Sequence, residues 1–221
     1  MKNILIDTEQ RGLRGDVIAT ELGHLWAYLL QRGALANYRS IGFCAIGDDE
    51  GSNHVAANLA LYVGARGLRV VLVEATLRSP ELAGMFELTE TPGLAELLAD
   101  RATLADTVRP RVAPGVDVVP AGGTTDAFWG FTNDRFAAAV TDLLRDRDVC
   151  FVDVPGINRA PEAALVVRSV DALVLVVEAN RHDADVVRRN ITWLRSLGTP
   201  FLGAVLTDVV YDLPAAIARL T

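Results

Sequence analysis

The stretch that most constrains the fold is an apolar strand followed by a short polar loop and an amphipathic helix, over residues 43–60. The loop contains Gly47 and Gly51, and the helix begins directly after the second glycine. This is the layout of a phosphate-binding loop, in which backbone N–H groups and the helix dipole converge on an anion. Such a loop needs a lysine after its second glycine, but Ser52 stands there. The sequence therefore predicts the frame of a nucleotide-binding domain with an altered loop.

The rest of the chain alternates between strand-length apolar runs and helical segments. Strands are predicted at residues 41–46, 69–74, 116–119, 149–154, 172–178 and 201–206. Helices are predicted at residues 16–36, 53–65, 80–86, 93–99, 103–109, 134–147, 161–168, 183–197 and 213–220. Apolar strands separated by helices predict a mostly parallel sheet with helices on both faces. We expect a single doubly wound α/β domain over residues 1–221, with an N-terminal arm and helix at 1–36 and a core at 41–210.

Charge and composition narrow the class of function. The net charge is −7 and the basic residues are scattered, which argues against a nucleic-acid interface. No apolar run approaches the roughly 20 residues needed to cross a bilayer, and no secretory signal is visible, so we expect a cytoplasmic protein. Cys44 and Cys150 fall in predicted core strands, where buried free thiols are expected rather than a disulfide or a metal site.

Several blocks of the chain match the motifs of one family, in order and at that family's spacing. Residues 71–80 are similar to its motif LLVDADLRRP, and residues 152–155 to its Walker B segment IDTPP. Further similar blocks are residues 55–60, Phe86 with residues 93–98, residues 120–122 and residues 202–209. From about residue 16 to 210 the chain thus resembles the ATPase domain of bacterial tyrosine kinases (BY-kinases) of polysaccharide co-polymerase systems. These kinases are part of the MinD/ParA group with deviant Walker motifs, and the resemblance implies a P-loop NTPase-like fold.

The loop itself departs from the family pattern PGEGKST. On this chain it reads Asp48, Asp49, Glu50, Gly51, Ser52, Asn53 and His54. Ser52 lacks the lysine charge at the β- and γ-phosphates, and Asn53 lacks the hydroxyl that ligates Mg²⁺. Asp49 replaces a glycine where the backbone approaches the phosphates closely. Three carboxylates in one turn also repel a triphosphate, so we expect this degenerate loop not to bind nucleotide.

Other positions of the implied nucleotide site have changed too. By the resemblance, the second acidic motif supplies two aspartates, and here these positions are Glu74 and Thr76. The family's base-contacting asparagine is Thr207. Asp153 keeps the Walker B acid, so Asp153 and Glu74 are the relic catalytic candidates. An aspartate at the end of a buried strand also serves as a turn former or helix cap, so its presence alone does not establish catalysis.

Two regions are candidates for oligomer or partner surfaces. The family joins subunits through a Glu-x-x-Arg-x-x-Arg pattern, of which this chain keeps Glu21 but has His24 and Ala27 in place of the arginines. Phe128, Trp129 and Phe131 cluster in a predicted loop, where they suggest either a partner surface or a segment folded back over the core. 

Two further features bear on metal binding and kinase activity. His182, Asp183 and Asp185 open a predicted helix, and capping explains them without a metal. The tyrosine-rich tail that the kinases phosphorylate is reduced to Tyr211, which argues against autokinase activity in that form.

These departures predict a catalytically inactive pseudo-ATPase or pseudokinase, acting as a regulatory or partner-binding subunit in bacterial exopolysaccharide or capsule biosynthesis or export. The resemblance implies as partner the cytoplasmic segment of an inner-membrane co-polymerase protein, through which the chain would associate with the membrane, and it allows a homo-oligomer. We expect no cofactor, no metal, no nucleic acid and no direct membrane insertion.

Three alternatives remain open. The first is an atypical ATPase or tyrosine kinase with ATP and Mg²⁺, its missing lysine supplied by a partner or by Arg78. The second is a MinD/ParA-like positioning protein. The third is a site for a cation or a cationic side chain, formed by Asp48, Asp49, Glu50, Glu74 and Asp153.

Overall fold

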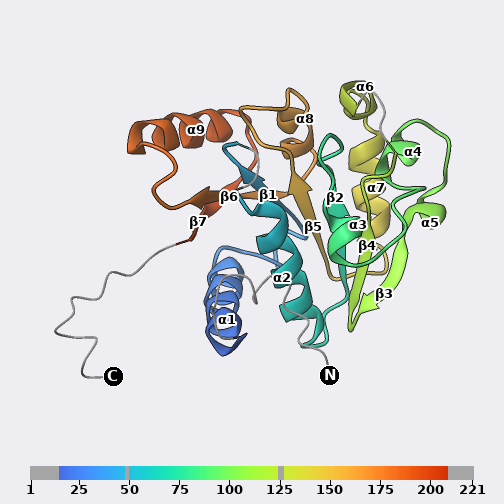
Figure 1. The fold of residues 1–221 in the computed structure, drawn as a ribbon, viewed down its shortest axis with the longest axis horizontal. Coiled ribbons are helices and arrows are strands. Elements are labelled where there is room, and N and C mark those ends of the chain that lie inside the picture. Colours follow the sequence, from blue (N-terminus) through green and yellow to red (C-terminus); the bar gives the residue numbers. More distant parts are fainter. Residues whose placement is uncertain (1–14, 48–49, 124–126, 209–221) are drawn as a thin grey trace.

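The computed structural model describes residues 15–47, 50–123 and 127–208. Within these residues, seven strands form one sheet in the order β3-β4-β2-β5-β1-β6-β7 (Figure 1). The strands are β1 (Ser40–Ala45), β2 (Val70–Glu74), β3 (Arg109–Ala113), β4 (Val116–Val119), β5 (Val149–Val154), β6 (Ala172–Glu178) and β7 (Phe201–Thr207). Neighbouring strands are parallel except β3 and β4, which are antiparallel. The predicted mostly parallel sheet is confirmed.

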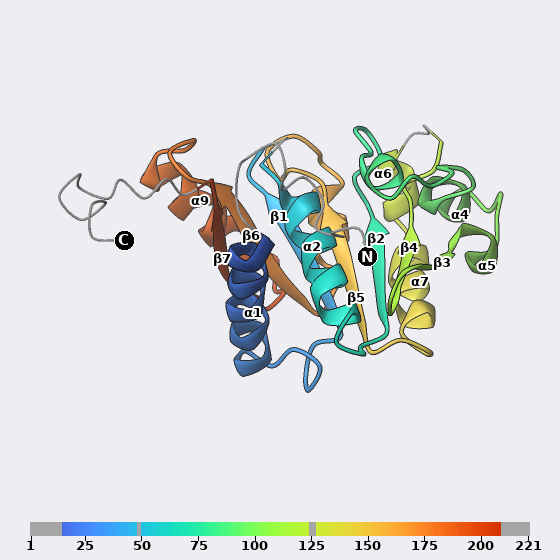
Figure 2. The ribbon, with the colours of Figure 1, turned by 60° about the horizontal axis from the view of Figure 1, so that its bottom comes forward.

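Helices cover both faces of this sheet. They are α1 (Gly15–Gln31), α2 (Ser52–Gly64), α3 (Leu82–Met85), α4 (Leu94–Leu98), α5 (Leu104–Thr107), α6 (Ala127–Phe131), α7 (Arg135–Leu143), α8 (Ala163–Val167) and α9 (Ala184–Ser196). Apolar residues of α1, α2 and α3 pack on one face, where α1 and α2 lie side by side (Figure 2). Residues of α4, α6, α7, α8 and α9 pack on the other face. This two-sided packing confirms the doubly wound α/β class.

The central strands β1 and β5 are buried at every residue. Phe43 and Phe151 meet edge to face with ring centroids 5.5 Å apart, and Trp26 of α1 packs against Phe151 at 6.2 Å. Cys44 and Cys150 are buried free thiols, as predicted. Burial raises the pKa of both thiols, so they remain protonated and contribute as small apolar side chains.

The first helix ends earlier than predicted. The sequence pattern extends it to residue 36, but α1 ends at Gln31. Gly33 has a positive φ of 107°, and the N–H of Ala34 turns back to the carbonyl of Leu29 at 2.9 Å. This is a glycine-terminated helix end, in which the left-handed residue stops the helix and satisfies its last carbonyls.

An edge strand was missed by the sequence analysis. The predicted helix at 103–109 ends at Thr107, and the next residues form β3, which pairs with β4. Pro110 lies inside β3, and proline in a strand is tolerated only at a sheet edge or a bulge. Gly115, with a φ of 72°, supports the turn between the two strands. Pro110 therefore marks an edge strand and not the end of a helix.

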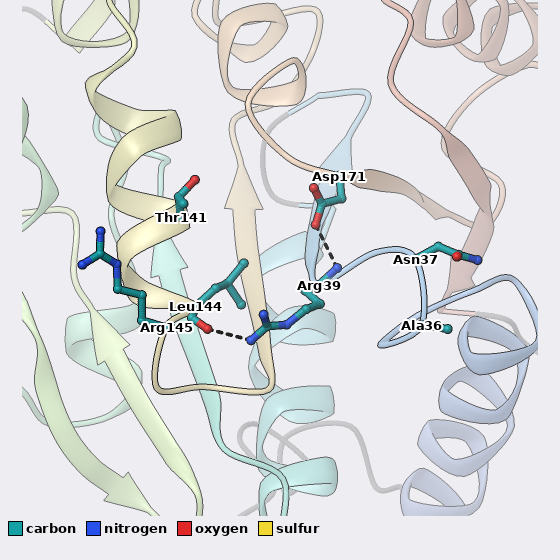
Figure 3. Close-up of a pocket in the computed structure, with 7 residues that line it drawn as sticks. All are labelled: Ala36, Asn37, Arg39, Thr141, Leu144, Arg145 and Asp171. Atoms are coloured by element: carbon teal, nitrogen blue, oxygen red, sulfur yellow. Dashed lines mark hydrogen bonds between the residues drawn. The ribbon is translucent and has the colours of Figure 1, made fainter.

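A hollow of about 330 Å³ lies at the amino ends of β1 and β6, away from the loop that follows β1 (Figure 3). Its polar groups are engaged within the protein. The Arg39 guanidinium donates to the carbonyls of Leu144, Arg147 and Asp148, at the end of α7 and in the segment that follows it. One Asp171 carboxylate oxygen accepts the N–H groups of Arg39 and Ser40, each at 2.8 Å. These bonds fasten α7 to the sheet, so we assign this hollow a structural role.

Some predictions fall on residues outside the described ranges. These are the N-terminal arm before residue 15, the helix at 213–220 with Tyr211 before it, and the loop residues Asp48 and Asp49. The division into an arm and a core also stays a prediction. In the described ranges, no helix combines the length and apolar character that crossing a membrane requires.

Candidate functional site

The candidate site lies where β1, β5 and β2 end side by side. In the parallel register, Phe43 of β1 is opposite Asp153 of β5, and Asp153 is opposite Glu74 of β2. The carboxyl ends of parallel strands are where open α/β sheets bind ligands. The sheet therefore brings both predicted relic acids next to the loop that joins β1 to α2. The hollow between these elements measures about 40 Å³, enough for about one water molecule.

Asp153 lies at the floor of this hollow and is 2% exposed. Its Oδ1 accepts a hydrogen bond from the Ser52 hydroxyl at 3.1 Å. Burial raises the pKa of Asp153 to about 7, and the negative charge of Glu74 adds to this, while hydrogen bonds from Thr76 and Ser52 oppose it. Ser52 stands at the position of the lysine in the pattern PGEGKST, and its contact with Asp153 is made by an uncharged hydroxyl.

Glu50 is the loop residue whose contacts differ most from those expected from the sequence. It is 3% exposed, and its Oε1 accepts the N–H of Gly47 at 2.6 Å. The same oxygen lies 2.8 Å from Nε2 of His182, on the segment between β6 and α9. This distance is that of a hydrogen bond between the imidazole and the carboxylate. The carboxylate of Glu50 thus points back into its own loop.

The sequence places Glu50 in an acidic turn and indicates no partner for its side chain. His182 was assigned to helix capping, but the structure brings it to the loop across 132 residues of sequence. No local signal indicates such a contact, because it depends on β6 lying next to β1 in the sheet. Thr207, the predicted base position, donates from its hydroxyl to the Glu50 carbonyl at 3.4 Å.

The remaining residues of the loop make contacts at the start of α2 and with the segment before α3. Gly51 has a φ of 80° and precedes the first residue of α2. Asn53, at the position of the metal-binding hydroxyl, donates from its amide to Glu81 at 2.5 Å. Its carbonyl oxygen lies 2.7 Å from the backbone nitrogen of His54 and 2.9 Å from Nδ1 of the same residue. Asn53 therefore links the start of α2 to the segment before α3.

Glu74 has a structural environment. It is 1% exposed, and its Oε1 accepts the N–H groups of Glu81 at 2.5 Å and Leu82 at 2.7 Å, at the start of α3. Its Oε2 accepts the N–H of Ala121 at 3.1 Å. Burial raises the pKa of Glu74, and these three hydrogen bonds oppose the rise. The longer side chain of glutamate, where the family has aspartate, joins α3 to the turn after β4.

The candidate partner residues lie in different environments. Glu21 and His24 are exposed neighbours on α1, where Nδ1 of His24 lies 3.9 Å from Oε2 of Glu21. Trp129 on α6 is 66% exposed, whereas Phe131 is 4% exposed and packs on Phe136 with centroids 5.3 Å apart. Phe131 is therefore a core residue and not part of a partner surface, so for this side chain the structure agrees with the alternative of a segment folded back over the core. The predicted loop is the short helix α6, and the side chain of Phe128 lies outside the described residues.

The structure also places residues of two alternative functions, the atypical ATPase or kinase and the cation site. Nε of Arg78, the proposed substitute for the missing lysine, donates to the buried carboxylate of Glu162 at 2.8 Å. In the part of the chain that the structure describes, no group of three or more His, Cys, Asp or Glu residues is placed to hold a metal ion. Asp48 and Asp49, which belong to the proposed cation site, lie outside that part.

Comparison with solved structures identifies the fold class of this chain. The solved structure of MinD from Pyrococcus horikoshii, complexed with Mg-ADP, matches with a TM-score of 0.68 and 20% identity, over 82% of this chain and 76% of that chain. The kinase domain of the Escherichia coli tyrosine kinase ETK matches with a TM-score of 0.81 and 22% identity, over 88% of this chain and 78% of that chain. The fold is that of the P-loop NTPases of the MinD/ParA group.

Comparison of sequences identifies proteins that are similar to this chain. No family model matches the chain. The putative tyrosine-protein kinase CapB of Staphylococcus aureus is 26% identical over 163 residues, which cover 73% of this chain and 72% of CapB. The tyrosine-protein kinase CpsD of Streptococcus agalactiae is 25% identical over 171 residues, which cover 76% of this chain and 75% of CpsD. The chain is thus similar in sequence to these tyrosine-protein kinases and has the same fold as the ETK kinase domain and MinD, in agreement with the resemblance of its motifs.

Proposed function

We propose that this chain is a pseudo-ATPase that acts as a partner-binding subunit in bacterial polysaccharide biosynthesis or export. The observation that carries the proposal is Ser52, which stands at the lysine position of the loop and donates its hydroxyl to Oδ1 of Asp153 at 3.1 Å. Glu50, which the pattern PGEGKST also has at this position, is buried in the same loop, where its carboxylate adds negative charge near the place that a nucleotide would occupy. The serine at the lysine position leaves no cation on that residue to offset this charge.

The link to polysaccharides rests on the relatives. Besides CapB and CpsD, the chain is 25% identical over 172 residues to the succinoglycan biosynthesis transport protein ExoP of Rhizobium meliloti. That match covers 76% of this chain but 22% of ExoP, so the matching segment is one part of a longer protein. This supports a domain that works together with other segments, and we propose the cytoplasmic part of an inner-membrane co-polymerase protein as the partner.

A partner-binding experiment tests this function. The cytoplasmic segment of the co-polymerase protein from the same organism is titrated into the purified chain with and without Mg-ATP. Because we propose that nucleotide does not occupy the loop, the dissociation constant is expected to change less than about twofold, or about 0.4 kcal/mol, on addition of Mg-ATP. A change of tenfold or more would show nucleotide-dependent coupling and would favour the atypical ATPase or kinase. Absence of binding in both conditions would contradict the proposed partner.

A further inference from the structure

Three residues at which the chain departs from the family motifs each bond to a neighbouring element. Ser52, the first residue of α2, donates its hydroxyl to Oδ1 of Asp153, near the end of β5, at 3.1 Å. Asn53 donates from Nδ2 to the carboxylate of Glu81, directly before α3, at 2.5 Å. Glu74, at the end of β2, accepts the N–H of Glu81 at 2.5 Å. These bonds join α2 to β5, and they join both α2 and β2 to the start of α3.

Glu81 receives two of these bonds. Its N–H is donated to Glu74, and its carboxylate accepts from Asn53. Its carbonyl accepts the N–H of Met85, inside α3, at 2.9 Å. The N–H of Leu82 is also donated to Glu74, at 2.7 Å. Hydrogen bonds to ionised carboxylates are stronger than neutral ones, so the start of this four-residue helix is fixed from two sides.

In proteins that bind nucleotide through such a loop, the two positions after the second glycine contact the ligand. The lysine contacts the β- and γ-phosphates, and the hydroxyl holds Mg²⁺. In GTPases, contacts to the γ-phosphate and Mg²⁺ order two switch segments, which are released on hydrolysis. In this chain the same two positions, Ser52 and Asn53, bond to β5 and to the start of α3. Side chains of the protein thus supply a link between these elements.

We propose that Ser52, Asn53 and Glu74 form a latch that holds the start of α3 to α2 and β2 without nucleotide. This inference deepens the proposed function and rests on it, because a subunit whose loop does not bind nucleotide needs another way to fix this edge of the sheet. The edge then keeps one conformation at every nucleotide concentration. A partner-binding subunit that is always competent to bind requires such a conformation.

Amide hydrogen exchange of the full chain carrying Asn53→Asp tests the latch. Aspartate keeps the oxygen that lies next to the backbone nitrogen of His54, and it suits the first turn of a helix. It replaces the donor, however, by a carboxylate that faces the carboxylate of Glu81. The amides of Met85 and Phe86, which bond to carbonyls at the start of α3, are therefore expected to exchange at least about tenfold faster. Exchange in β1 and β5 is expected to stay unchanged.

A matched control and a rescue variant accompany this measurement. The control is Asn133→Asp, which adds the same charge before α7, where Oδ1 of Asn133 accepts the N–H of Arg135 at 3.1 Å. It is expected to leave exchange in α3 unchanged. The double variant Asn53→Asp/Glu81→Gln exchanges the donor and the acceptor of the latch. It is expected to restore the slow exchange in α3.

Equal exchange of Met85 and Phe86 in Asn53→Asp and in the wild type would overturn the proposal. Faster exchange that Glu81→Gln does not reverse would overturn it too, because position 53 would then act without Glu81. These measurements contain neither nucleotide nor partner. Their failure would leave the proposed function standing, and failure of the partner titration would leave their outcome unchanged.

Discussion

Replacement of Asp153 by asparagine is expected to raise the free energy of unfolding at pH 8, by as much as about 4 kcal/mol. The pKa of Asp153 is about 7 in the folded chain, because the side chain is buried next to Glu74, against an ordinary value of 3.8. At pH 8 the wild-type chain therefore folds with an ionised carboxylate in a poorly solvated site. Asparagine keeps the shape and can still accept the hydrogen bond from Ser52.

The raised pKa of Asp153 determines how the effect of Asp153→Asn on the free energy of unfolding changes with pH. Because the folded pKa is raised, the folded state binds a proton more tightly than the unfolded state between about pH 4 and pH 7. The stabilisation by this proton is complete below pH 4 and is lost as the pH rises through 7. The difference in unfolding free energy between Asp153→Asn and wild type should thus grow from pH 4 to pH 7 and then level off.

Urea denaturation at pH 4, 6 and 8 checks this expectation. The control is Asp185→Asn, since the Asp185 side chain is 79% exposed and pairs with Arg188 on the helix surface. Its effect is expected to stay within about 0.5 kcal/mol at each pH. A difference between Asp153→Asn and wild type that is constant from pH 4 to pH 8 would show that Asp153 is not held in a desolvated site.

Replacement of Glu74 by alanine is expected to lower the free energy of unfolding by roughly 3–5 kcal/mol. Three backbone N–H groups, those of Glu81, Leu82 and Ala121, lose their acceptor and remain near a cavity that water does not fill well. Glu74→Asp restores the family residue, yet it should also destabilise the chain, because the shorter side chain does not span both α3 and the turn after β4.

Chemical denaturation at pH 7 measures both variants, with Glu90→Ala as the exposed control. A cost below about 1 kcal/mol for Glu74→Ala would contradict the structural role assigned to Glu74. If Glu74→Asp stabilised the chain, the glutamate would be a misfit at the position of the family's aspartate rather than a link between two elements.

The sheet was predictable from sequence because its central strands are continuous apolar runs. Residues 149–154 and 172–177 are buried in the structure, and a parallel sheet covered on both sides buries such runs completely. Helix ends were less predictable. The end of α1 at Gln31 depends on the left-handed conformation of Gly33, whereas the apolar pattern continues beyond it.

The candidate site was predictable in its parts but not in its contacts. The loop frame, Asp153 and Glu74 follow from motif spacing along the chain. The pairing of Glu50 with His182 does not, because it joins the end of β1 to the segment after β6. The structural role of Glu74 was not predictable either, because its hydrogen-bond partners are backbone N–H groups, which do not depend on the type of side chain. Contacts between neighbouring strand ends are set by strand order, and strand order appears only in three dimensions.

The central claim, that the loop does not bind nucleotide, is tested most directly by calorimetry of the wild-type chain with Mg-ATP. Pyrococcus horikoshii MinD, whose solved structure is a complex with Mg-ADP, is the positive control for the same fold. We predict no saturable heat for the wild-type chain up to about 1 mM nucleotide, which corresponds to a binding free energy weaker than about 4 kcal/mol. A dissociation constant in the micromolar range would contradict this account.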